Sequence, residues 1–343
     1  MNWVRPQIEK LQPYIPGKQI KRDVIKLNAN ENPYPPSQKA IAAMNKIHAG
    51  TLRLYPDAVS TSLRKIAANI FEVTEKNIIV GNGSDDALTM IIRTFLDAGD
   101  SIAVVDPTYT LYETLAEIQG AKTEVHPLND DYTLPESFFH TKSKVIFLPN
   151  PNAQTGTLFP VEKIERLCAK KENVVVVDEA YADFAGVTVI PLIKKYENLI
   201  VLRTMSKSYS LAGIRVGFGI SNTKIISSLM KVKDSYNVNS ISQIIAGEAL
   251  TDRDHFNKNI GKITKTREWF SEKLLSLGWE VTSSAANFIL VEPKDHSPKE
   301  IMEKLERAGF LIRYFNTPRL KNKLRISIGT DEQMEMMLDV ITN

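Results

Sequence analysis

The chain has 343 residues and a formal net charge of only +3, which argues against a nucleic-acid polymer or an anionic membrane as its main partner. Hydrophobic residues make up 43% of the sequence, and its single cysteine, Cys168, excludes an intramolecular disulfide and a cysteine-rich zinc site. The start MNWVRPQIEK is polar within a few residues, and no apolar run approaches the ~20 residues that cross a bilayer. We therefore expect a cytoplasmic enzyme.

The segment up to Pro36 contains the strings PYIPG and NPYPP, which predict an extended arm rather than a helix. From about residue 77 to 220, short apolar strands then alternate with amphipathic helices such as 85–96 and 160–171. The predicted strands are 77–80, 101–105, 144–148, 173–177, 198–202 and 215–220. Runs of β-branched residues such as the valines at 174–177 are typical of strands buried on both faces. The alternation predicts an α/β fold with a mostly parallel central sheet.

After about residue 240 the pattern changes to that of an α+β unit. We expect a long polar helix over 253–277, strands near 279–293 and a helix in SPKEIMEKLERAGF. Strands LIRYF and LRISI and a helix that begins at Asp331 complete the chain. We therefore predict a large domain over 37–240 and a small discontinuous domain made of an N-terminal arm, 1–36, and residues 241–343.

Polar residues follow several predicted strands, at the sheet edge where ligands bind in open parallel sheets. GNGSDD (81–86) runs into a helix that begins near Ser84, which suits either a phosphate site or a simple capped turn. Asp178 follows the buried valines, where it is either a cap or a functional acid, and Lys207 follows the strand 198–202, where it is either a surface lysine or a functional amine. The loop PNPNAQTG (149–156) could likewise contribute to a ligand site or form only a turn. Their convergence on one edge favours a ligand site.

Pyridoxal phosphate matches the chemistry of this edge. Its phosphate would lie on the helix start at Ser84, its ring nitrogen on Asp178, and its aldehyde would form a Schiff base with Lys207. Arg215, eight residues after Lys207, could return to the phosphate with its planar fork.

The string SKSYSLAGIRVGF (206–218) resembles the lysine motif of class II aminotransferases of fold type I. Further matches in the family's order are NANENP (28–33), RLYP (53–56), DPTY (106–109), NPNAQTG (150–156), DEAY (178–181) and LRISIGT (324–330). They span nearly the whole chain, and the resemblance implies a fold-type I pyridoxal-phosphate-dependent transferase. The short N-terminal arm and the IRYF…LRISIGT ending are most similar to histidinol-phosphate aminotransferases.

The resemblance implies a role for each matched cofactor residue. Lys207 would be the Schiff-base lysine and proton shuttle, Asp178 would hold the pyridine nitrogen, and Tyr181 the phenolic oxygen of the ring. Tyr109 would stack on the ring face, and Tyr55 would reach the phosphate of a neighbouring subunit, which implies a homodimer with shared active sites. The residues expected around the phosphate are Ser84, Asp85, Thr204, Ser206 and Arg215.

For the substrates, the resemblance implies that Arg325 clamps the carboxylate of glutamate and that Asn30, in NANENP, lies in the substrate site. Tyr14 and Arg313 match positions that contact the substrate phosphate, although surface packing is an equally open interpretation for these two.

The chain departs from the family in one loop. The family usually has NPNNPTG where this chain has NPNAQTG, so the asparagine that contacts the ring oxygen falls on Ala153 and the proline on Gln154. Asn152, one residue earlier, is our candidate for that contact. An unreplaced hydrogen bond to a charged oxygen would cost about 1.5–3 kcal/mol.

The resemblance implies transamination of L-histidinol phosphate with 2-oxoglutarate, which gives imidazole-acetol phosphate and glutamate in histidine biosynthesis. A threonine-phosphate decarboxylase and an aromatic amino acid aminotransferase remain alternatives. The ligand-sensing domain of a transcription regulator does not fit, because only ~30 residues precede NANENP, too few for a DNA-binding domain. No metal is expected, because the five histidines show no metal-ligand spacing.

Overall fold

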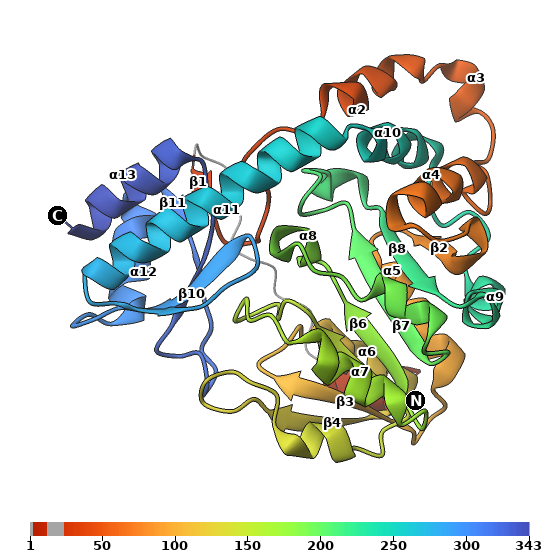
Figure 1. Ribbon diagram of the computed structural model, residues 1–343, viewed down its shortest axis with the longest axis horizontal. Coiled ribbons are helices and arrows are strands. Elements are labelled where there is room, and N and C mark those ends of the chain that lie inside the picture. Colours follow the sequence, from red (N-terminus) through yellow and green to blue (C-terminus); the bar gives the residue numbers. More distant parts are fainter. Residues whose placement is uncertain (1–2, 12–23, 343) are drawn as a thin grey trace.

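The computed structural model describes residues 3–11 and 24–342, and it contains a seven-stranded sheet, a four-stranded sheet and a separate pair of short strands (Figure 1). The larger sheet has seven strands in the order β2-β8-β7-β6-β5-β3-β4. These strands are β2 (Ile78–Gly81), β3 (Ser101–Asp106), β4 (Lys122–Pro127), β5 (Val145–Pro149), β6 (Val174–Asp178), β7 (Leu199–Thr204) and β8 (Gly217–Ser221). β8 pairs antiparallel with both β2 and β7, and the other neighbouring strands of this sheet pair in parallel. The predicted α/β fold with a mostly parallel central sheet is confirmed.

Both faces of this sheet are covered, because successive side chains of a strand point to opposite faces. In β6, Val175 and Val177 join one core, whereas Val176 joins the other. The first face is covered by α4 (Thr61–Phe71), α7 (Val161–Ala169) and α10 (Ser240–Thr251), and the second by α5 (Ser84–Phe95), α6 (Leu111–Gln119) and α9 (Thr223–Val232). The continuous apolar runs of the sequence are explained by this double burial.

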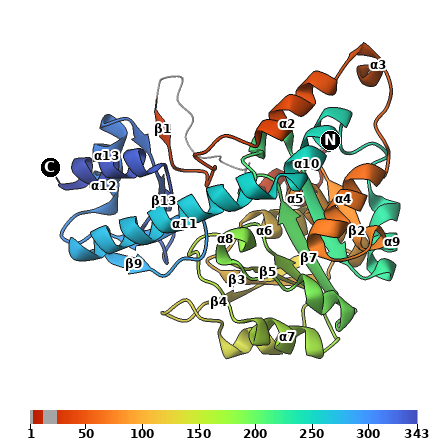
Figure 2. The same cartoon turned by 45° about the horizontal axis from the view of Figure 1, so that its top comes forward.

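The smaller sheet is antiparallel, with the order β12-β13-β10-β9. It consists of β9 (Glu280–Thr282), β10 (Phe288–Glu292), β12 (Arg313–Tyr314) and β13 (Leu324–Ser327), and it packs with α11 (Arg253–Ser276), α12 (Pro298–Arg307) and α13 (Asp331–Thr342). The helix α11 runs from α10 to this smaller sheet (Figure 2). The predicted helices and strands of the C-terminal region are therefore present.

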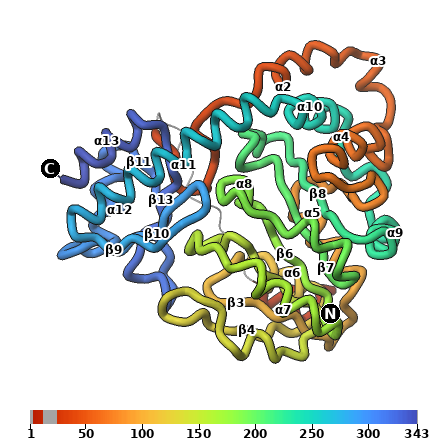
Figure 3. The backbone as a smooth tube through the Cα atoms, in the orientation of Figure 1, coloured from red at the N-terminus to blue at the C-terminus, as the bar shows by residue number. Residues whose placement is uncertain are grey.

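The N-terminal segment joins the two ends of the chain. β1 (Ile25–Lys26) pairs in parallel with β11 (Phe310–Leu311), and the backbone then passes back towards α2 (Gln38–Ala42) beside α11 (Figure 3). The arm is not wholly extended as predicted, because Pro6 begins a single turn of helix, α1 (Pro6–Lys10). Proline is compatible with the first position of a helix, since its missing N–H has no partner there.

The predicted division of the chain at residues 36 and 240 remains a prediction. α10 packs against α2 and α4, whereas α11 contacts β9 and β10 of the smaller sheet. The remaining short helices are α3 (Ala49–Leu52) and α8 (Ala182–Ala185). Over the part of the chain that the structure describes, no helix combines the length and apolar character needed to cross a bilayer.

Candidate active site

A cavity of about 570 Å³ lies at the carboxyl ends of the parallel strands, where the sequence predicted a ligand site. Its wall combines segments from the start, middle and end of the chain. The predicted site residues that line it are Asn30, Ser84, Asp85, Tyr109, Asp178, Tyr181, Thr204, Ser206, Lys207, Arg215, Arg313 and Arg325. Twelve side chains selected from sequence motifs are thus brought together in one cavity.

One end of the cavity is formed by the start of α5, where β8 comes unusually close. A Cβ atom on Gly217 would lie 2.4 Å from the Ser84 nitrogen, so only glycine permits this approach. Gly83 has φ +85, and a Cβ there would lie 2.6 Å from Arg215 Nη2. The two glycines therefore let the Arg215 guanidinium lie directly over the helix start, which gives an anion two sources of positive potential.

Polar side chains surround this end. Arg215 Nη2 donates to Asp85 Oδ2 at 3.2 Å, and Arg215 Nη1 donates to the Ser206 hydroxyl at 3.3 Å. The Thr204 hydroxyl lies 3.0 Å from the same Ser206 oxygen. The group is compact and rich in donors, as a phosphate site requires.

Asp178 lies at the end of β6, buried, and its hydrogen-bond donors are neutral. The Tyr112 hydroxyl donates to Oδ2 at 2.8 Å, and the Ala180 N–H donates to Oδ1 at 3.1 Å. Burial raises the pKa of the Asp178 carboxyl to about 6, although these two hydrogen bonds oppose the shift. A buried carboxylate of this kind suits a cationic partner inside the cavity, such as a protonated ring nitrogen.

Lys207 follows β7, and its position is set by the N-terminal segment. Its Nζ donates to the Ala29 carbonyl at 3.0 Å and lies 5.8 Å from the centre of the Tyr181 ring. The Asn32 amide donates to the Lys207 carbonyl at 3.0 Å, and the Asn30 amide donates to the Tyr181 hydroxyl at 3.0 Å. The motif NANENP thus orients both the amine and the phenol.

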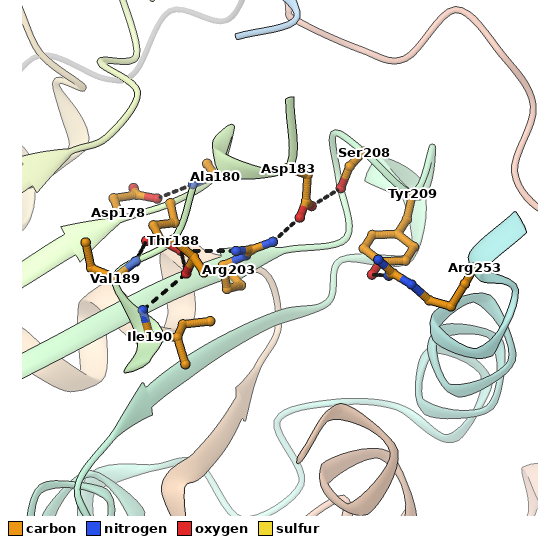
Figure 4. A network of polar contacts seen from close by, with 11 residues as sticks. Asp178, Ala180, Asp183, Thr188, Val189, Ile190, Arg203, Ser208, Tyr209 and Arg253 are labelled. Carbon is orange, nitrogen blue, oxygen red and sulfur yellow. Dashed lines mark hydrogen bonds and ion pairs between the residues drawn. The ribbon is translucent and has the colours of Figure 1, made fainter. Parts of the chain in front are cut away.

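A buried ionic network lies close to Asp178 (Figure 4). Arg203 of β7 donates to Glu179 at 3.0 Å and also to Asp183, while the Ser208 hydroxyl donates to Asp183 Oδ2 at 2.5 Å. Glu179 is the neighbour of Asp178 and Ser208 that of Lys207, so the network ties together the two segments that carry the acid and the amine.

Two further arginines of the cavity wall come from the smaller sheet. Arg313 and Arg325 are paired residues of β12 and β13, and both guanidinium groups lie 5.1 Å from the centre of the Phe315 ring. Because arginine forks recognise carboxylates and phosphates, this pair can hold an anionic group of a substrate.

Three predicted site residues are placed differently or lie outside the description. Asn152 is not part of the cavity wall: its amide donates to the Pro107 carbonyl and accepts from the N–H groups of Gln154 and Thr155. This location does not support the predicted cofactor contact, because both the nitrogen and the oxygen of the side-chain amide already form hydrogen bonds within the protein. Tyr55 is 80% exposed and is not part of the cavity wall of its own subunit. Tyr14 lies outside the described residues.

Tyr112, Asn32 and Gln154 contact predicted site residues but were not themselves predicted as part of the site. Tyr112 lies three residues after Tyr109, on the helix that follows DPTY, and this helical spacing was the available signal. Asn32 belongs to NANENP, and Gln154 was noted only as a departure from the family.

The side chains present fit pyridoxal phosphate. The donor-rich end at Ser84 and Arg215 would hold its phosphate, buried Asp178 its ring nitrogen and Lys207 its aldehyde. Tyr109 and Tyr181 are also part of the wall of this cavity.

Comparison with known proteins gives a consistent result. Residues 22–341 match the family model "Aminotransferase class I and II". A histidinol-phosphate aminotransferase from Geotalea uraniireducens is 42% identical over 340 residues, which cover 98% of each chain. The crystal structure of histidinol-phosphate aminotransferase from Sinorhizobium meliloti in complex with pyridoxal-5'-phosphate has a TM-score of 0.90 at 24% identity, covering 100% of this chain and 98% of that one. A threonine-phosphate decarboxylase from Porphyromonas gingivalis shares the fold, with a TM-score of 0.82 at 22% identity over 93% of this chain and 98% of the other. The chain therefore belongs to the class I and II aminotransferase family.

Proposed function

We propose that this protein is a pyridoxal-phosphate-dependent histidinol-phosphate aminotransferase of histidine biosynthesis. It would transfer the amino group of L-histidinol phosphate to 2-oxoglutarate and so produce imidazole-acetol phosphate and glutamate. The observation that carries the proposal is one cavity that holds an amine, a buried acid and arginines from both sheet regions, in a chain that matches a histidinol-phosphate aminotransferase over 98% of its length.

When bound, pyridoxal phosphate supplies an electron-accepting ring that stabilises negative charge on the substrate carbon next to nitrogen. Ser84 and Arg215 would hold its phosphate, and Asp178 would keep its ring nitrogen protonated. Tyr181, oriented by Asn30, would donate to the ring oxygen.

Lys207 is the group that moves the proton. Its Nζ would remove a proton from the substrate carbon and return it elsewhere, as a general base and then a general acid. The hydrogen bond to the Ala29 carbonyl at 3.0 Å limits the positions that Nζ can take.

The arginines of the cavity serve different anions. Arg215 lies against the start of α5 and would hold the cofactor phosphate, whereas Arg313 and Arg325 come from the smaller sheet and would hold the substrate. Histidinol phosphate presents a phosphate and 2-oxoglutarate a carboxylate, so one pair of arginine forks can receive either substrate in turn. We assign Arg325 to both substrates and Arg313 mainly to histidinol phosphate.

A panel of amino donors tests the proposal. L-Histidinol phosphate, histidinol, aromatic amino acids and O-phosphothreonine would be assayed with 2-oxoglutarate while CO₂ release is followed. We expect histidinol phosphate to be the best donor, with a kcat/KM at least about tenfold above that of histidinol, because loss of one charge-assisted contact costs at least about 1.4 kcal/mol. Equal use of both would favour an amino acid aminotransferase, and CO₂ from O-phosphothreonine a decarboxylase.

We also propose a cytoplasmic homodimer with shared active sites. An exposed apolar surface supports it: Leu52, Leu54 and Tyr55 lie together in sequence, and the Tyr55 ring stacks on Tyr236 at 4.5 Å. Exposed apolar patches commonly mark interfaces. Since Tyr55 does not line its own cavity, a role in the site of a second subunit accounts for its position.

A further inference from the structure

Gln154 lies in the loop after β5, is only 8% exposed and borders the cavity. Its Nε2 donates to the Thr108 carbonyl at 3.1 Å, and its Oε1 accepts from Arg325 Nη1 at 2.9 Å. A carbonyl only accepts and a guanidinium only donates, so the amide has a single orientation that satisfies both partners. Thr108 thereby fixes Oε1 towards Arg325.

The contact determines how the Arg325 guanidinium lies. The two hydrogens of Nη1 have two acceptors, the Ala153 carbonyl at 3.0 Å and Gln154 Oε1. Because a guanidinium is planar, two acceptors at one nitrogen set the direction of the whole group. The rings of Phe288 and Phe315, with centres 5.2 and 5.1 Å from Arg325 Cζ, flank it as well.

These bonds also connect the two sheets. Arg325 belongs to β13 of the smaller sheet, whereas Ala153 and Gln154 follow β5 of the larger one. The Ala153 carbonyl would be available whatever residue stood at 154, but Oε1 exists only because that residue is glutamine. Proline, the usual residue at this position in the resembled family, offers no side-chain acceptor.

We propose that Gln154 is a positioning residue that holds Arg325 in the orientation that receives the carboxylate of 2-oxoglutarate or glutamate. The inference rests on the proposed function, because that function supplies the carboxylate. A guanidinium oriented before binding loses less freedom when its ligand arrives, so Gln154 raises affinity for carboxylates without touching the reacting atoms. Gln154 does not hydrogen-bond Asp178, Lys207 or Arg215, so we expect its substitution to leave cofactor affinity unchanged.

The test replaces Gln154 with methionine, which has a similar length but cannot accept from Arg325 in the same way. The matched control is Gln119→Met: Gln119 of α6 donates to the Leu96 carbonyl at 2.9 Å and is not part of the cavity wall. The dissociation constant of maleate, a dicarboxylate with neither amine nor ketone, would be measured calorimetrically on each holoenzyme. The dissociation constant of the cofactor would be measured in parallel by fluorescence.

In Gln154→Met we expect the maleate dissociation constant and the KM for 2-oxoglutarate to rise about tenfold, with kcat changed less than about twofold. Cofactor affinity should stay at the wild-type value, and Gln119→Met should change none of these quantities. In an Arg325→Lys background the additional effect of Gln154→Met should disappear, because the partner is no longer a planar fork. A merely structural role would instead weaken cofactor and carboxylate binding together.

Gln154→Ala decides the matter if the methionine variant does not fold, since it removes the acceptor towards Arg325 without adding bulk. Its maleate dissociation constant should again rise about tenfold. Wild-type affinity for maleate in either folded variant would overturn the inference, even if the enzyme transaminates histidinol phosphate. Absence of transamination by the wild-type protein would overturn the proposed function instead, while the maleate measurements would still decide the role of Gln154.

Discussion

The Tyr112 hydroxyl donates a hydrogen bond of 2.8 Å to Asp178 Oδ2, although 66 residues separate the two in the chain. The Tyr112 ring stacks on Phe147 with centres 5.0 Å apart and meets Tyr109 edge-on at 5.5 Å, so neighbouring rings fix its position. A fully buried donor of this kind stabilises the charged form of the acid and partly offsets the effect of burial on its pKa.

Replacing Tyr112 with phenylalanine should therefore raise the pKa of Asp178 further above 6. A hydrogen bond to a charged group is worth about 1.5–3 kcal/mol, which corresponds to a shift of about 1–2 pH units. Because ring-nitrogen binding needs the ionised carboxylate, the midpoint of cofactor affinity against pH should move upward by the same amount. Fluorescence titration with pyridoxal phosphate between pH 5 and 9 measures the midpoint, and an unchanged midpoint would show that Tyr112 only packs.

Asp178→Asn should stabilise the cofactor-free protein more at pH 8 than at pH 4. In the folded state the pKa of Asp178 is raised from 3.8 to about 6 by burial, so the folded protein holds this proton more tightly than the unfolded chain. The contribution of Asp178 to stability consequently falls as pH rises from about 4 to 6, by about 3 kcal/mol in total. Urea unfolding of both proteins across this range measures the gap, and a gap independent of pH would contradict the prediction.

Arg313→Ala should weaken the use of histidinol phosphate more than that of glutamate. Loss of a charge-assisted contact of about 1.5–3 kcal/mol should lower kcat/KM for histidinol phosphate roughly ten- to hundredfold. Arg325→Ala should impair both half-reactions, because both substrates present an anion to it. Single-turnover spectroscopy follows each half-reaction separately. If Arg313→Ala left both half-reactions unchanged, the assignment of the substrate phosphate to Arg313 would be wrong.

The proposed sharing of sites predicts complementation between two inactive proteins. Lys207→Ala lacks the amine, and Tyr55→Asp, at a position 80% exposed, should fold but lose the contact with the other subunit. After dissociation and mixing, activity should return to about a quarter of the wild-type value, since half of the dimers are hybrids with one intact site each. An active monomer in sedimentation velocity, or no recovery from confirmed hybrids, would refute shared sites.

Removing Arg203 should strongly destabilise the fold. Arg203→Met would leave Glu179 and Asp183 buried without their cation, at a cost of about 3–5 kcal/mol in the free energy of unfolding. The control Lys144→Met removes a more exposed pair with Asp100 and should change unfolding much less. Equal effects of the two substitutions in urea denaturation would rule out a special role for the buried network.

Strong local patterns made most of the fold predictable. The run of valines in β6 predicted both the strand and its burial, because strands that are buried on both faces are rich in consecutive β-branched residues. β4 was missed, since this edge strand exposes most of its side chains and its sequence KTEVHP is largely polar. The helical turn at Pro6 was missed because proline suits the start of a helix as well as an extended segment.

The part of the candidate site that could be predicted consists of residues in sequence motifs at the ends of strands. Lys207 and Asp178 follow neighbouring strands, and parallel pairing brings such ends to one edge. The contacts of Asn152 and Tyr112 were not predictable, because they depend on the loop conformation and side-chain packing of segments 45 and 66 residues away. Sequence position alone does not determine which way an amide in a tight loop points.

The pairing of β1 with β11 has a consequence for biosynthesis on the ribosome. Ile25 and Phe310 are partners although roughly 285 residues separate them, and the cavity needs both Asn30 near the first of these strands and Arg325 beyond the second. At a translation rate of ~5–20 residues per second, the N-terminal arm waits roughly 15–60 s for its partner strand. The seven-stranded sheet can form earlier, but a nascent chain cannot enclose its cofactor from both sides until Arg325 has been translated and has left the ribosome.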